Sequence, residues 1–160
     1  MNETELENAM ISFNNGEGVD QNQISLSNHA RSPYIRFDLI DSGNEFKSLS
    51  NLISLSDKAH FVATVDGEYM KLYTNGEDVG LIPSTQTDVT PSLLTRKFHH
   101  LGRQSWTSDD DSNLPFSFDG TIAYVRLWHG LALDADQVAE LYALRIEPTP
   151  APTGAVAPTP

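Results

Sequence analysis

Residues 60–76 read HFVATVDGEYMKLYTNG, and this stretch indicates the fold more clearly than any other part of the chain. Two runs of β-branched, apolar and aromatic residues are each followed by a turn pair, Asp66-Gly67 and Asn75-Gly76. Such pairs reach positive φ at little cost, as tight hairpin turns require. A third run, Val79 to Ile82, follows the second pair. The sequence therefore predicts a three-stranded antiparallel meander from His60 to Ile82.

The residues around this meander also alternate with a period of two, which is the period of a strand. Further predicted strands are Ala9–Phe13, Gln23–Leu26, Tyr34–Ile40, Glu45–Leu49, His99–Arg103 and Thr121–Trp128. Many short strands separated by turn signals are typical of two packed antiparallel sheets. We expect an all-β, two-sheet antiparallel sandwich.

One helix is predicted near the C-terminal end of the domain. Asp134 and Gln137 have the spacing of a capping box, in which each residue satisfies a backbone N–H at the start of the helix. The apolar face would contain Val138, Leu141 and Tyr142. Arg145 stands near the C-terminal end, where the helix dipole favours a cation. We expect this short helix to pack against the sandwich.

Composition excludes several classes of protein. The chain has 160 residues, with 10 Lys and Arg against 22 Asp and Glu, and a formal net charge of -12. This charge disfavours binding to nucleic acid or to an anionic membrane surface. No apolar run reaches the ~20 residues that span a bilayer, and the absence of cysteine excludes disulfide frameworks and thiol catalysis. Met1 to Met10 lacks the pattern of a signal peptide, so the protein is cytosolic or the sequence begins after a processed or truncated segment.

The composition changes once, after Glu147. Residues 148–160 read PTPAPTGAVAPTP, which favours an extended polyproline conformation and cannot join a packed core. We therefore expect one domain over residues 1–147 and a tail or linker over 148–160. The alternative to a plain linker is an O-glycosylated stalk, with candidate sites at Thr149, Thr153 and Thr159. Asn2 begins an N-x-[ST] sequon and is a candidate N-glycosylation site.

The order of several motifs resembles laminin G-like domains of the concanavalin A-like lectin/glucanase superfamily. The motifs are His60–Gly67, Met70–Gly76, Leu101-Gly102-Arg103, Phe118–Ile122, Val125–Trp128 and the run from Leu131 to Leu141-Tyr142. The resemblance extends from about Ile11 to Tyr142 and implies a jelly-roll sandwich. Members commonly carry an acidic pair where Ala123 and Tyr124 stand here. They also open with strands that have no counterpart before Ala9, so we expect the first strands to be missing and strand edges to be exposed.

Enzymatic activity is not expected. Glucanases of this superfamily use carboxylates spaced E-x-D-x-x-E or nearly so, because two of them must flank the glycosidic bond. That spacing does not occur in the sequence. His99 and His100 would point to opposite faces of a strand, so we expect one to pack and one to be solvated. His129 accompanies no nucleophile motif.

An acidic loop is the candidate metal site. Asp109, Asp111 and Asn113 have the D-x-D-x-N spacing that opens some Ca²⁺ loops, and hard cations prefer such oxygen ligands. The loop lacks the glycine and the final Glu of an EF-hand. Two interpretations of this loop stay open. One is a weak Ca²⁺ site, and the simpler one is a solvated acidic hairpin tip.

The candidate glycan site lies beside this loop. Trp106 could stack against a sugar ring, with Gln104 and Asn113 nearby as hydrogen-bonding groups, although packing of Trp106 in a core or edge is the alternative. Trp128 follows the core pattern of the resembled family, so we interpret it as a packing residue.

Two functions fit these observations. One is a non-catalytic, lectin-like structural subunit of a glycosylated surface fibre or sheath, which self-assembles with neighbouring subunits. The other is an extracellular glycan- or protein-binding adhesion module of a larger protein. Both imply an extracellular or cell-surface location and no membrane insertion. For the first, Asn2 to Phe13 is the predicted donor strand, and head-to-tail contacts would produce a filament.

Overall fold

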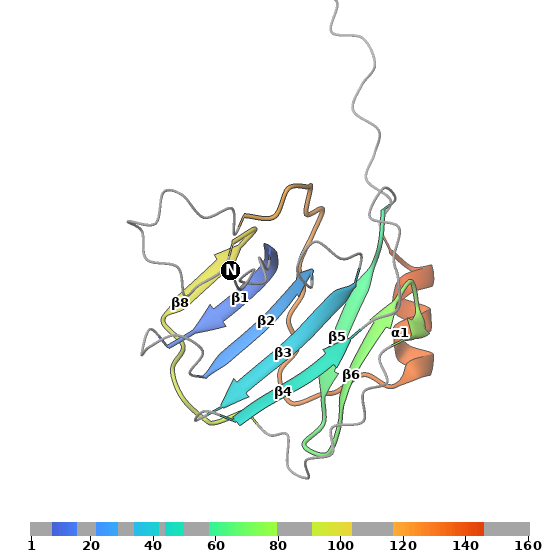
Figure 1. Ribbon diagram of the computed structural model, residues 1–160. Coiled ribbons are helices and arrows are strands. Elements are labelled where there is room, and N and C mark those ends of the chain that lie inside the picture. The colour runs from blue at the N-terminus through green and yellow to red at the C-terminus, as the bar shows by residue number, and fades with distance from the viewer. Residues whose placement is uncertain are drawn as a thin grey trace, which may run out of the picture.

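The computed structural model describes residues 8–15, 22–28, 34–41, 44–49, 58–79, 91–103 and 117–145. These residues form two antiparallel sheets and one short helix, as the sequence predicts, so the protein is a β-sandwich (Figure 1). The strands are β1 (Asn8–Asn14), β2 (Gln23–Asn28), β3 (Ile35–Asp41), β4 (Asn44–Leu49), β5 (Phe61–Val65), β6 (Met70–Thr74), β7 (Glu77–Asp78) and β8 (Phe98–Leu101), and the helix is α1 (Ala135–Ala143).

The first sheet has five strands in the order β4-β3-β2-β1-β8, side by side in Figure 1. Its register aligns Ser12 with Ser25, and Ser25 with Asp38. β1 pairs with β2 on one side and with β8 on the other. The prediction of Asn2 to Phe13 as a donor strand for another chain is therefore wrong for Asn8 to Phe13, because their backbone groups already pair within this sheet.

The second sheet is the predicted meander, in the order β5-β6-β7. Asn75 and Gly76 have φ values of 53° and 87°, as expected for the turn between β6 and β7. The third strand is Glu77–Asp78, two residues earlier than the predicted start at Val79. Residues 80–82 lie outside the described part of the chain.

The second sheet lies between two apolar layers. Phe61, Ala63 and Val65 face the first sheet, where they join the core formed by Met10, Ile35, Phe37, Leu39, Met70 and Leu72. Val62 and Tyr73 point to the opposite face and pack against Val138 of α1. This alternation along β5 and β6 explains why β-branched and aromatic residues occupy both faces.

Helix α1 begins as the sequence predicts. Asp134 Oδ1 accepts a hydrogen bond from the Gln137 N–H at 2.9 Å, and Gln137 Oε1 accepts one from the Asp134 N–H at 3.0 Å. At the other end, Arg145 Nη1 donates to the Tyr142 carbonyl at 3.0 Å. The capping box and the apolar face of the helix are confirmed.

The predicted strand over Thr121–Trp128 is wrong. Residues 117–133 form no strand, and within the described residues the only bridges here join Ser117 to Ala9 and Arg103. Their composition favours a strand, but propensity alone does not form one without a paired neighbour. Trp128 is 45% exposed, so its interpretation as a packing residue is also wrong.

Candidate functional site

The site residues predicted from the sequence all lie outside the described residues. They are the glycan candidates Trp106, Gln104 and Asn113, the Ca²⁺ candidates Asp109, Asp111 and Asn113, and the glycosylation candidates Asn2, Thr149, Thr153 and Thr159. These remain predictions. Within the described ranges, no three His, Asp or Glu side chains gather as metal ligands would.

The two adjacent histidines lie on the edge strand β8. His99 is exposed, and its ring meets the Phe13 ring edge-on with centroids 5.3 Å apart. Its Nε2 lies 2.7 Å from the Arg96 carbonyl. His100 is half-buried. One histidine is thus exposed and the other is half-buried. The exposed one, His99, also contacts the Phe13 ring.

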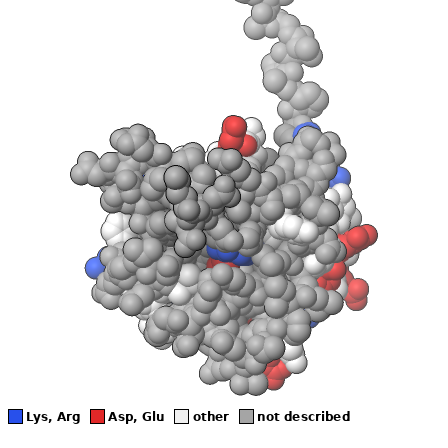
Figure 2. Space-filling model, viewed as in Figure 1, with Lys and Arg blue, Asp and Glu red and all other residues white. Residues whose placement is uncertain are grey.

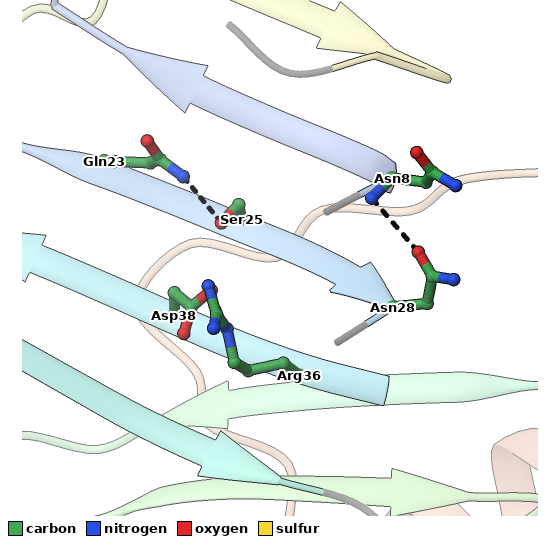
Figure 3. Close-up of polar contacts among 6 residues, drawn as sticks. All are labelled: Asn8, Gln23, Ser25, Asn28, Arg36 and Asp38. Carbon is green, nitrogen blue, oxygen red and sulfur yellow. Dashed lines mark hydrogen bonds and ion pairs between the residues drawn. The ribbon is translucent and has the colours of Figure 1, made fainter. Parts of the chain in front are cut away.

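A polar row runs across the first sheet, on the face opposite the core (Figure 3). Gln23 Nε2 donates to Ser25 Oγ at 2.8 Å, and Arg36 Nε lies 2.6 Å from Asp38 Oδ2. Ser25, Arg36 and Asp38 are all buried. Because these groups pair with each other away from solvent, we interpret the row as structural, and not as an open ligand site.

Described residues of both sheets and of the segment 117–133 line a cavity of about 1510 Å³. One wall is the apolar face of β1 and β2, which contributes Met10, Phe13, Ile24 and Leu26. The second wall is β5, and the third is residues 117–133. Thr121–Trp128, which forms no strand, lies along this third wall.

Exposed aromatic side chains line this cavity. Tyr124 is 39% exposed and Trp128 is 45% exposed, and both belong to the third wall. Leu127 and Leu131 beside them are also exposed. A contiguous apolar surface that remains in contact with water is typical of a binding site.

The described lining of the cavity has more cations than anions, although the protein is acidic. Its described lining contains four Lys and Arg residues, namely Lys58, Arg96, Arg126 and Arg145, and two acidic residues, namely Asp66 and Asp119. The whole chain, by contrast, has a net charge of -12. Figure 2 shows described acidic side chains along the outline of the molecule, including the side where α1 stands, with Lys and Arg side chains on the outline as well. The described lining of the cavity is therefore less acidic than the chain as a whole.

Two arginines and three rings meet at one end of the cavity, around His60. The His60 ring lies 6.2 Å from the Tyr124 ring and 5.9 Å from the Tyr142 ring. The guanidinium carbon of Arg126 is 5.2 Å from the Tyr124 centroid, and that of Arg145 is 4.0 Å from the Tyr142 centroid. Cation–π contacts of this kind hold the arginines against the rings. We call these five residues the His60 cluster.

The Asn75-Gly76 turn positions this cluster. Asn75 Oδ1 accepts a hydrogen bond from the His60 N–H at 3.0 Å, and the Asn75 N–H donates to the His60 carbonyl at 2.8 Å. A Cβ on Gly76 would lie 3.2 Å from the side chain of Tyr142, so the turn passes close to α1. The same two residues that form the hairpin thus fix the places of His60 and Tyr142.

The cluster has a positive electrostatic field. Partial burial, followed by the charges of Arg145 and Arg126, lowers the pKa of His60 below its ordinary value of 6.5. His60 is therefore neutral at pH 7, and the two guanidinium groups carry the charge of the cluster. This arrangement favours a negatively charged group at this end of the cavity.

Comparison with known families agrees with the fold. Residues 2–139 match the family model described as the concanavalin A-like lectin/glucanases superfamily, in its laminin G-like branch. The chain belongs to this family. No curated protein gives a significant match to this laminin G-like domain. No described helix is long and apolar enough to cross a membrane.

Among solved structures, the domain is similar to a crystal structure of an S-layer domain-containing protein from Clostridium thermocellum. The sequence identity is 23% and the TM-score is 0.45. The match covers 89% of this chain and 65% of the other, so this chain spans less than two thirds of the length of that protein fragment.

Sequence reasoning did not find the His60 cluster of this laminin G-like domain. It interpreted Arg145 as a helix-end cation and Tyr142 as part of an apolar helix face, and both interpretations are correct locally. The only signal of a site was the substitution of Ala123 and Tyr124 for the acidic pair of the family, which places an exposed ring on the cavity wall.

Proposed function

We propose that this laminin G-like domain is a non-catalytic recognition module that works outside the cell and binds a carbohydrate in its cavity. One observation carries the proposal, namely an open cavity of about 1510 Å³ with the exposed rings of Tyr124 and Trp128 on its wall. Aromatic side chains at a wet surface offer an apolar face and a polar tip, which suits the mixed surface of a sugar.

The size and lining of the cavity support an oligosaccharide. Cavities for small molecules usually measure about 300–1,000 Å³, and this one is larger. The glycan candidates Trp106, Gln104 and Asn113, and weak Ca²⁺ binding through Asp109, Asp111 and Asn113, remain part of this proposal on the sequence pattern alone.

One of the two described carboxylates of the lining has a structural role, which supports a function without catalysis. Asp66 and Asp119 are the acidic residues of the described lining. Asp66 Oδ1 accepts hydrogen bonds from the N–H groups of Glu68 and Tyr69, at 2.9 and 2.7 Å, so it serves the turn. A glycosidase needs two carboxylates that flank the scissile bond.

The test is calorimetry of the purified protein against a panel of soluble oligosaccharides, with a matched pair of variants. Tyr124→Ala removes a ring from the cavity wall, and we expect it to weaken binding at least tenfold. Tyr69→Ala removes a ring that is 52% exposed outside the cavity, and it should leave binding unchanged. Equal losses in both variants, or no binding to any oligosaccharide, would contradict the proposal.

Two further measurements test the absence of catalysis and the extracellular location that this proposal includes. Turnover of a β-glucan by the pure protein, abolished by one Asp or Glu substitution, would show that the domain is an enzyme. Mass spectrometry of the native material would show glycans on Asn2, Thr149, Thr153 or Thr159 if the protein passes through a glycosylating, extracellular route.

A second candidate function is a structural subunit of a glycosylated surface fibre or sheath. It is favoured by β8, which is the outermost strand of the first sheet within the described residues and carries the exposed side chains of Phe98 and Leu101. An exposed apolar edge strand favours pairing with another chain. Light scattering and electron microscopy of the native material would show filaments, whereas a monodisperse monomer at high concentration would exclude this function.

A further inference from the structure

Arg126 presents a positive charge to the cavity. It belongs to the third wall, lines the cavity and is exposed. Its guanidinium carbon lies 5.2 Å from the centre of the Tyr124 ring, and this cation–π contact favours one position of the side chain. Tyr124 is itself 39% exposed. A ligand that touches the Tyr124 ring therefore comes within reach of a cation.

The other members of the His60 cluster add charge and a hydrogen-bonding group at the same end of the cavity. Arg145 lies 4.0 Å from the Tyr142 ring centre and donates to the Tyr142 carbonyl, so its contribution here is its charge. After partial burial, the charges of Arg145 and then Arg126 lower the pKa of His60. Both guanidinium groups thus act on one point. The neutral imidazole can still donate or accept a hydrogen bond.

Charge is distributed unevenly along β5. His60 precedes the strand, whereas Asp66 follows it and stands at the opposite end. A strand rises about 3.3 Å per residue, so about 20 Å separate these two residues. That distance exceeds the Debye length of about 10 Å at 0.1 M salt. The carboxylate of Asp66 therefore does little to oppose an anion at the His60 end, and Asp119 is not among the charges that shift the pKa of His60.

The charge of the whole chain limits how acidic a ligand can be. The net charge is -12, so a ligand with many negative charges is repelled at long range. The attraction of the His60 cluster is local to one end of the cavity. A ligand with one negative charge on an otherwise neutral body gains this attraction and adds little repulsion elsewhere.

The shape of the guanidinium group favours a carboxylate as that charge. Its planar fork offers two parallel N–H donors to the two carboxylate oxygens. We infer that the ligand of this cavity is an oligosaccharide with a single carboxylate, such as one uronic acid unit, and that Arg126 binds the carboxylate while the sugar contacts the exposed part of Tyr124. This inference rests on the carbohydrate-binding function proposed above and names the class of sugar.

The test is calorimetry of the purified full-length chain against matched pairs of tetrasaccharides of glucose, galactose or mannose. Each neutral tetrasaccharide is compared with the form in which one terminal hydroxymethyl group is oxidised to a carboxylate. At least one oxidised form should bind at least tenfold more tightly than its neutral parent. This preference should fall at least threefold when NaCl is raised from about 20 mM to about 300 mM, because salt screens the attraction.

Two variants that each remove one positive charge locate the carboxylate. Arg126→Gln should reduce the preference for the oxidised form to less than about threefold, because the charge-assisted hydrogen bonds are lost. Lys97→Gln removes the same charge at an exposed residue outside the cavity, and it should leave the preference unchanged. Arg126→Lys keeps the charge without the planar fork and should give an intermediate preference. Circular dichroism checks that each variant folds.

The outcomes separate this inference from the function on which it rests. If the native protein binds neutral and oxidised forms equally, or if Arg126→Gln and Lys97→Gln have equal effects, the inference is wrong and carbohydrate binding stands. If no tetrasaccharide of either form binds, both are wrong. A preference that does not change with NaCl, or tighter binding of a fully sulfated tetrasaccharide than of the singly oxidised one, would also overturn the inference.

Discussion

At the scale of single residues, the Asn75-Gly76 pair has two roles. It forms the turn between β6 and β7, and it also holds His60 and approaches Tyr142. A hairpin signal that depends only on local backbone preference therefore also decides the geometry of the His60 cluster. Substitutions here should affect both stability and the cavity.

Gly76→Ala should destabilise the protein by about 2 kcal/mol, because it combines a strained positive φ with a contact of 3.2 Å to Tyr142. Gly130→Ala is the control, since Gly130 has a φ of 78° and no neighbour within 4 Å of an added Cβ. Gly130→Ala should lower the free energy of unfolding by about 1 kcal/mol, through backbone strain alone. Urea unfolding of both variants measures the difference, and equal losses would mean that the contact with α1 does not matter.

His60 should make stability depend on pH. Because its pKa is lowered in the folded state, the unfolded chain binds the proton more tightly. The free energy of unfolding should therefore fall as the pH drops from 6.5 toward the lower folded pKa, and should not depend on this group above that range. His60→Gln should remove this part of the dependence. Urea titrations at several pH values would check it, and a variant with the same slope as the native protein would refute it.

At the scale of elements, local sequence signals predict the helix correctly but do not decide which segments pair as strands. Helix α1 forms where its capping box and apolar stripe predict, since both act within a few residues of the chain. Thr121–Trp128 has a strong strand composition and yet does not pair. A helix satisfies its own backbone, whereas a strand depends on an edge that another part of the chain must offer.

Asp134→Ala should cost about 1 kcal/mol, because it leaves the Gln137 N–H without its cap. Asp136→Ala is a suitable control, since Asp136 lies in the first turn but is not the cap. It should lose only the smaller interaction with the helix dipole, about 0.5 kcal/mol. Thermal unfolding followed by circular dichroism would rank the two, and the reverse order would contradict the role of the capping box.

At the scale of the whole molecule, charge opposes compactness. The chain has 160 residues and a net charge of -12, so its negative side chains repel one another. Salt screens the repulsion between charges that are farther apart than a Debye length, which is about 10 Å at 0.1 M. Raising NaCl from about 10 mM to about 150 mM should therefore raise the melting temperature. A lower melting temperature would mean that attractive pairs, such as the ion pair of Arg36 and Asp38, outweigh the general repulsion.

The sequence by itself determined the features that depend on neighbouring residues. The meander with its two turns, the helix with its capping box and the sandwich of alternating strands all follow from local backbone preference and from side-chain period. The order of motifs also indicated the family before any comparison.

Only the tertiary structure decided the site. His60, Tyr124 and Tyr142 come from three separate parts of the chain, and each has an ordinary local explanation that hides the cluster. Thr121–Trp128 forms one wall of the cavity because this segment joins neither sheet, and β1 is unavailable as a donor because β2 and β8 both pair with it. The physical reason is that pairing and packing between distant segments depend on which strand edges and sheet faces remain free. A local sequence pattern does not contain this information.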